Sequence, residues 1–126
     1  MNNYDIKKHI NDNDDIKQLF KKYIKNYLAF GVFIDNGYKP SQDDIEYAIM
    51  NGFHDNTISE LLDSNEKFII SNDIFKYIIK YDYRDLTFKG LDDGLIPTQK
   101  EFFKIYKNIG EDLNVKIVII YNIYVL

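Results

Sequence analysis

Apolar residues recur every three or four positions between residues 14 and 30, which is the spacing of an amphipathic helix. Lysines occupy the opposite face of this predicted helix, and Asp14 or Asp15 would cap its first turn. The polar residues before it predict a turn, preceded by a short segment that carries Ile6 and Ile10. The apolar positions of the helix are Ile16, Leu19, Phe20, Tyr23, Ile24, Tyr27 and Leu28.

Several later segments begin with residues that favour the start of a helix. A Ser or Thr followed three residues on by an acid has the spacing of a capping box, in which the two side chains satisfy backbone N–H groups reciprocally. We expect a helix after each of these starts. They are Ser41 with Asp44, Thr57 with Glu60, and Thr98 with Glu101, while Ser71 or Asn72 can cap a further helix.

Glycine and proline are placed between the predicted helices. Pro40 and Pro97 precede two of the caps, where a fixed φ stiffens the entry without interrupting a helix. Every glycine is expected at a helix end or in a turn, where a left-handed backbone costs glycine least. These glycines are Gly31, Gly37, Gly52, Gly90, Gly94 and Gly110.

The pattern of caps and apolar positions repeats along the chain. Residues 37–51 match residues 94–108 at an offset of 57, and SQDDIEYAI at 41–49 matches SNDIFKYII at 71–79 at an offset of 30. A period near 30 with two helices per unit is typical of a solenoid, in which stacked helix pairs bury a continuous core. The repeated Gly-x-x-Pro-Ser/Thr segment is therefore interpreted as a turn and a cap.

The first of these units resembles an ankyrin repeat. Ile45, Ala48, Gly52 and Leu61–Leu62 are similar to the Leu, Ala, Gly and Leu-Leu positions of that family, and FIDNGYKPS at 33–41 is similar to the turn between two repeats. The Thr-Pro-Leu-His opening of the family is replaced here by residues 43–46. The resemblance spans about residues 30–120 and implies a short helical solenoid that binds proteins through its turn tips and one helix face.

The C-terminal residues 115–126 allow two predictions. Seven of these twelve residues are β-branched, which favours a strand. The repeat alignment instead makes them the second helix of the last pair. The sequence thus predicts an all-α fold of stacked helix-turn-helix repeats, with an α+β fold ending in a C-terminal strand as the alternative.

Length and charge add a domain count and a class of partner. The 126 residues, 45% of them apolar, predict a single domain over 1–126, with capping helices over 1–30 and repeat-like helix pairs over 31–126. The net charge is only −4, but residues 31–72 contain two lysines against eight acidic residues. This acidic block favours a protein partner with a basic surface, and it argues against nucleic acid, which is bound by clustered Lys and Arg.

Other features indicate an intracellular protein that does not span a membrane. The chain has no cysteine, which excludes disulfides and thiolate metal sites and fits a reducing cytoplasm. Its polar N-terminus predicts no secretory signal, and its longest apolar run, 115–126, is shorter than the roughly 20 residues that a membrane span needs. The abundance of Ile, Asn, Lys, Asp and Tyr is typical of AT-rich genomes, including those of phages and giant viruses.

The sequence offers little to catalysis or metal binding. His9 and His54 are far apart, and neither belongs to a ligand motif. The run at 12–16 lacks the glycine and the distal acid of a calcium loop. The acid pairs at 43–44 and 92–93 fall at predicted caps or turns, where acids are expected for structural reasons. We therefore expect no catalytic residues, no metal and no cofactor, with a small carboxylate-dependent hydrolase as the least favoured alternative.

The aromatic residues suggest where a partner would bind. Eleven Tyr and nine Phe are a high number, and Tyr is favoured at protein interfaces. Most lie on predicted core stripes, but Tyr38 and Phe53 fall in turns, and Tyr47 lies off the apolar stripe of its helix. Together with nearby polar residues they form the predicted partner-binding patch. It consists of Tyr38, Asp43, Glu46, Tyr47, Phe53 and His54.

The expected function is therefore a non-enzymatic protein–protein interaction module. If the chain comes from a virus or phage, such a module would fit an inhibitor of a host defence protein. The alternative is a structural or assembly protein that self-associates through its β-branched C-terminus.

Overall fold

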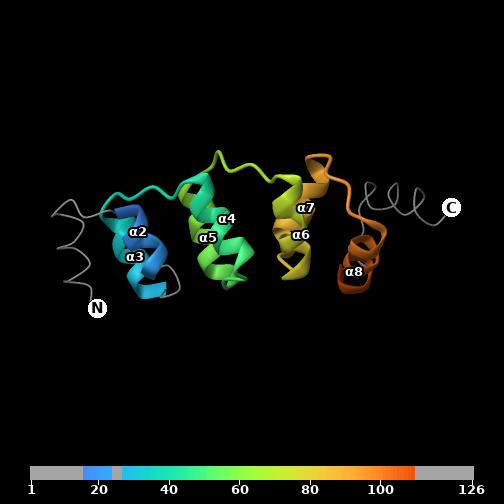
Figure 1. The fold of residues 1–126 in the computed structure, drawn as a ribbon, viewed down its shortest axis with the longest axis horizontal. Helices are drawn as coiled ribbons and strands as arrows, with labels where there is room; N and C mark the ends of the chain where they lie inside the picture. Colours follow the sequence, from blue (N-terminus) through green and yellow to red (C-terminus); the bar gives the residue numbers. More distant parts are fainter. Residues whose placement is uncertain (1–15, 24–26, 110–126) are drawn as a thin grey trace. The chain divides into compact units, whose positions relative to one another are not determined.

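A computed structural model of the chain describes residues 16–23 and 27–109. These residues form helices and no strand, so the all-α prediction is confirmed for this part of the chain (Figure 1). The choice between helix and strand for residues 115–126 lies outside the described residues, as do His9 and the predicted caps at Asp14 and Asp15. The helices are α2 (Ile16–Tyr23), α3 (Tyr27–Asp35), α4 (Gln42–Met50), α5 (Asp55–Ser64), α6 (Asn72–Lys80), α7 (Arg84–Asp92) and α8 (Gln99–Ile109).

The prediction of one helix over residues 14–30 is wrong. Two separate helices, α2 and α3, cover the described part of this segment, and they pack against each other. The apolar residues of this segment are numerous enough to give each helix an apolar face. Phe20 of α2 contacts Phe33 of α3 edge to face, with ring centroids 5.5 Å apart. Regular apolar spacing identified the helical state but not the break between the two helices.

Three of the four predicted helix starts are confirmed. Ser41 and Ser71 are the N-caps of α4 and α6, and each side chain accepts a hydrogen bond from the backbone N–H three residues later. Thr98 and Glu101 bond reciprocally at the start of α8, with distances of 2.9 and 3.2 Å. Each cap satisfies backbone donors that would otherwise lack a partner.

The predicted start at Thr57 is wrong. Helix α5 begins at Asp55, because the Nδ1 atom of His54 accepts a hydrogen bond from the Asn56 N–H at 3.1 Å and acts as the N-cap. Thr57 therefore lies within the helix and is buried. Histidine is an unusual cap, and the standard preferences do not identify it.

Helices α4 and α6 end in the same way, 30 residues apart. At the end of α4 the N–H groups of residues 51, 52 and 53 donate to the carbonyls of residues 47, 49 and 48, and residues 81–83 repeat these bonds at the end of α6. The turn requires a positive φ at its middle residue, which is Gly52 (67°) in one case and Asp82 (58°) in the other. The same three bonds end α3 at residues 36–38 and α7 at residues 93–95, so this turn is shared by four of the described helices.

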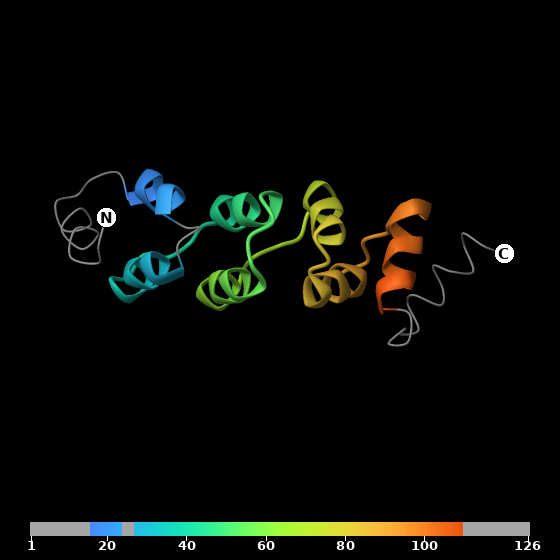
Figure 2. The ribbon, with the colours of Figure 1, turned by 90° about the horizontal axis from the view of Figure 1, so that it is seen from below.

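The chain divides into two compact units, Met1–Phe68 and Ile69–Leu126. In the first unit α2 packs on α3 and α4 packs on α5, while in the second unit α6 packs on both α7 and α8 (Figures 1 and 2). A single domain over residues 1–126 stays a prediction. The core of the first unit includes Phe20, Phe33, Ile45, Ala48, Ile49, Ile58 and Leu61, and that of the second includes Phe75, Ile78, Ile79, Leu86, Leu91, Phe102 and Ile105.

Two glycines lie inside helices, which corrects the prediction that every glycine falls at a helix end. Gly31 lies within α3 and Gly90 within α7. A Cβ atom at Gly90 would stand 2.4 Å from Cε1 of Phe75, so α7 approaches α6 more closely there than any side chain allows. A Cβ at Gly31 would meet nothing within 4 Å. Gly90 is therefore a packing residue rather than a turn residue.

These two glycines form a matched pair for a stability test. We expect Gly90→Ala to lower the free energy of unfolding by about 1–3 kcal/mol, because the buried Phe75 ring has to move. Gly31→Ala should raise it by about 0.5–1 kcal/mol, because alanine restricts the unfolded chain and favours helix. Urea unfolding followed by circular dichroism measures both values. Equal effects of the two substitutions would contradict the close approach of α7 to α6.

Candidate functional site

Helix α4, within the acidic block of residues 31–72, carries a line of polar and aromatic side chains on its outer face. Asp43, Glu46, Tyr47 and Met50 follow one another at intervals of three, one and three residues, so they lie on one side of the helix. The opposite side carries Ile45, Ala48 and Ile49, which are completely buried. We call the four outer residues the α4 stripe. It is the surface that the helix leaves to solvent once its apolar side is packed.

Tyr47 is held in place within this stripe. Its ring meets Phe53 edge to face, with centroids 5.9 Å apart, and Nζ of Lys21 lies 5.7 Å from its centroid. Beside it, Nε2 of Gln42 donates to Oε2 of Glu46 at 3.2 Å. A Tyr that is already ordered loses little entropy when it binds a partner, which suits it to be an anchor in an interface.

Two residues of the predicted patch contribute differently from what the sequence indicated. Phe53 lies in the turn after α4 as expected, but only 8% of the residue is exposed. It therefore packs against the ring of Tyr47 and offers little surface to a partner. His54 is exposed, but its Nδ1 atom caps α5. Asp43, Glu46 and Tyr47 keep the exposure that a contact surface requires.

Tyr38 also has a structural role. Its hydroxyl donates to Oδ2 of Asp44 at 2.6 Å, and its ring packs on Phe20 with centroids 4.5 Å apart. Asp44 is fully buried, and Oδ2 also accepts from the Ser41 N–H at 2.9 Å, while Oδ1 has no hydrogen-bond partner among the described residues. The Tyr38 hydroxyl therefore provides one of the two donors that compensate for the burial of this carboxylate.

Met50 belongs to the α4 stripe, although it is not part of the patch predicted from the sequence. It is 43% exposed and extends the stripe by one helical turn beyond Tyr47. Its position seven residues after Asp43 was the signal that could have identified it.

The stripe lies in a strongly acidic part of the first unit. From Gln42 to Ser64 the chain has six acidic residues and neither Lys nor Arg. Asp44 is buried, and the remaining five are Asp43, Glu46, Asp55, Glu60 and Asp63. The surface around α4 and α5 therefore attracts cationic groups.

The second unit carries the corresponding stripes with different side chains. At the offsets of 30 and 57, the stripe positions of α6 and α8 are mostly lysine. Seven of these eight residues are basic or aromatic, and Asp73 is the exception. The α6 stripe is Asp73, Lys76, Tyr77 and Lys80, and the α8 stripe is Lys100, Phe103, Lys104 and Lys107.

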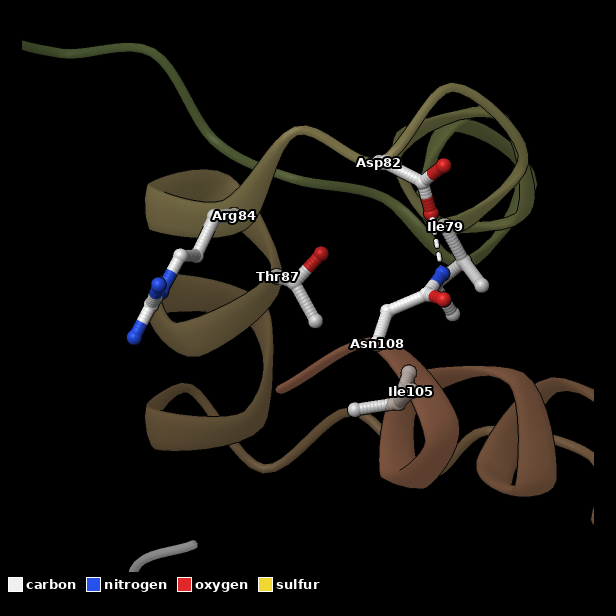
Figure 3. A pocket seen from close by; sticks show the side chains of 6 residues that line it. All are labelled: Ile79, Asp82, Arg84, Thr87, Ile105 and Asn108. Carbon is white, nitrogen blue, oxygen red and sulfur yellow. Dashed lines mark hydrogen bonds between the residues drawn. The ribbon is translucent and has the colours of Figure 1, made fainter. Parts of the chain in front are cut away.

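A small cleft in the second unit lies where α7 and α8 approach the end of α6 (Figure 3). Its volume is about 30 Å³, which accommodates a water molecule but no substrate. Its polar groups are used internally, since Nδ2 of Asn108 donates to Oδ1 of Asp82 at 2.8 Å and Oγ1 of Thr87 donates to the Tyr83 carbonyl at 2.8 Å. The side chain of Arg84 points away from Asp82 and Asn108 (Figure 3).

Two larger grooves are open to solvent. One, of about 630 Å³, lies between α6 and the loop before α8 and is lined by Phe75, Lys76 and Ile96 among others. The other, of about 500 Å³, lies at the end of α5 beside Lys39 and Lys67. Within residues 16–23 and 27–109, no three His, Cys, Asp or Glu side chains gather as a metal site requires, and no helix is long and apolar enough to cross a membrane.

A scan against protein-family models found no match, and searches of curated proteins and of solved structures found no similar protein.

The bond between Tyr38 and Asp44 can be tested by a double-mutant cycle. We expect Tyr38→Phe to lower the free energy of unfolding by about 1–3 kcal/mol, because a buried carboxylate loses a donor. In the Asp44→Ala background the same substitution should cost much less, because the acceptor is gone. Urea unfolding of the four proteins measures the coupling, and additive effects would contradict a structural role for the hydroxyl.

Asp82 offers a second test, because it adopts a positive φ that glycine tolerates best. We expect Asp82→Ala to be less stable than Asp82→Gly by about 1 kcal/mol, since both lose the bond to Asn108 but only alanine keeps the backbone strain. Gly52→Ala, at the same position of the turn after α4, should cost a similar amount. If Asp82→Gly proved the less stable of the two, the left-handed turn would not account for this residue.

Proposed function

We propose that the chain is a non-enzymatic interaction module that binds another protein through the α4 stripe. The observation that carries this proposal is a contrast between the two sides of the first helix in each pair. Two buried positions stay apolar from helix to helix, while the outer positions change in charge and size.

Two buried positions of the first helices are apolar in α4, α6 and α8, whereas the buried Asp44 corresponds to Ile74 and Glu101. Ile45 of α4 corresponds to Phe75 of α6 and Phe102 of α8, and all three are buried. The next core position gives the same result, with Ala48, Ile78 and Ile105. Packing allows only this class of residue there, because each first helix must bury its apolar side against a neighbour.

The outer positions, by contrast, differ in charge and size. Glu46 corresponds to Lys76 and Phe103, and Met50 corresponds to Lys80 and Lys107. All of these are at least partly exposed. A scaffold with a fixed core and variable outer side chains supports a binding role, because the outer residues are free to match a partner without affecting the fold.

The same repeats support an ankyrin-like stack of helix pairs. Helices α4, α6 and α8 begin 30 and 27 residues apart.

The partner that this surface favours is a protein with a basic patch. Asp43 and Glu46 attract its Lys or Arg residues, and the acidic α5 extends that attraction. Tyr47 and Met50 supply apolar area between the charges, where a partner side chain can be desolvated. The partner is thus selected by charge and anchored by these two side chains.

The proposal predicts the effect of reversing the charges of the stripe. Asp43→Lys combined with Glu46→Lys should abolish capture of a basic partner from the native host lysate by the tagged chain. Asp85→Lys combined with Asp92→Lys changes the charge equally on exposed positions of α7 in the second unit, outside the acidic surface of α4 and α5, and it should retain capture. Stepwise elution with salt should release the partner from the unaltered chain at moderate ionic strength, because salt screens exposed charge pairs.

Capture that survives reversal of Asp43 and Glu46 would overturn the assignment of the α4 stripe. Loss of capture in the control variant as well would show that the net charge of the chain, and not the α4 stripe, decides capture.

A further inference from the structure

The outer faces of α6 and α8 combine into one basic surface. The two helices pack side by side, and Nζ of Lys104 donates to the carbonyl of Lys80 at 2.6 Å. Asp82, at the end of α6, accepts from Nδ2 of Asn108 at 2.8 Å and lies 3.7 Å from Nζ of Lys104. These contacts fix the position of α8 against the end of α6. We call the two stripes together the α6–α8 face.

This face is strongly cationic for its size. Its eight residues include five lysines and one acid, Asp73. Phe103 on the same face is 48% exposed, and Ile96 in the adjoining groove is 64% exposed. Five cations around exposed apolar side chains form a surface that an acidic partner with apolar groups of its own would cover.

The chain itself carries a surface of this complementary chemistry. The α4 stripe has two acids and no base, and it offers Tyr47 and Met50 as apolar groups. Both surfaces are built from the same helical positions, so each helix spaces its side chains over about 10 Å in the same pattern. In an antiparallel arrangement Asp43 can therefore face Lys107, and Glu46 can face Lys104. Tyr47 then approaches Phe103.

We propose that the α6–α8 face of one chain docks on the α4 stripe of a second copy. The contact joins two different surfaces, so it is a heterologous, head-to-tail contact that can be repeated from copy to copy. Self-association then uses the helix faces and not the C-terminal residues 115–126. The inference rests on the proposed function in one respect, because both assign binding to the α4 stripe.

The test is sedimentation velocity of the purified full chain over a range of concentrations. At low salt the unaltered chain should form dimers and larger species as its concentration rises, and about 0.5 M NaCl should reverse this. Variant A, Lys100→Glu with Lys107→Glu, turns part of the basic face acidic. Variant B, Asp43→Lys with Glu46→Lys, turns the α4 stripe basic. Each variant alone should weaken self-association by about tenfold or more, because attraction becomes repulsion.

Mixing the two variants provides the decisive measurement. The unaltered α4 stripe of variant A matches the unaltered basic face of variant B, and the two reversed surfaces match each other in charge. The mixture should therefore form mixed dimers and larger species that neither variant forms alone. A misfolded variant could not restore association in this way. The control with Asp85→Lys and Asp92→Lys on α7, which belong to neither surface, should associate like the unaltered chain.

A chain that remains monomeric at every concentration in low salt would overturn the proposal. Association that is indifferent to both variants, or a mixture that stays monomeric, would overturn it as well. Capture of a basic host protein separates this outcome from failure of the proposed function, because variant A should retain such capture while losing self-association. Monomeric protein with capture that depends on the α4 stripe would leave the proposed function standing alone.

Discussion

None of the described helices is long enough to be stable alone in water. They contain 8 to 11 residues, whereas isolated helices shorter than about 12–15 residues are marginal. Each helix therefore depends on burying its apolar side against a neighbour, and this constraint accounts for the pairing of α2 with α3, α4 with α5, and α6 with α7. It also explains why the core positions of Ile45 and Ala48 are again apolar in α6 and α8.

The same constraint leaves the other side of each helix free. A side chain such as Glu46 has no part in the core, so its replacement by Lys76 or Phe103 at the next repeats costs the fold little. Charge can then accumulate on one unit and reverse on the other, as it does between α4 and α8. Surfaces of opposite charge on one repeated scaffold are the physical basis of both binding proposals.

Some residues that resemble binding residues are instead needed to hold the pairs together. Tyr38 compensates for a buried carboxylate, His54 caps a helix, and Phe53 fills the space under Tyr47. Asp82 occupies a turn position suited to glycine, yet its carboxylate links α6 to α8 through Asn108 and Lys104. In each case a polar or aromatic side chain in a turn serves a neighbouring element.

The sequence by itself determined what depends on nearby residues. Caps act over three residues, so Ser41, Ser71 and Thr98 located three helix starts, and the offsets of 30 and 57 identified the repeat. The apolar stripe of α4 likewise follows from spacing alone, and with it the exposure of Asp43, Glu46 and Tyr47.

Only the tertiary structure decided what depends on contacts between distant residues. It separated α2 from α3, set Gly90 against Phe75 of the neighbouring helix, and buried Phe53 in the turn after α4. It also directed the Tyr38 hydroxyl to Asp44. Burial and close approach arise from packing between elements, and local sequence patterns do not specify which elements pack together.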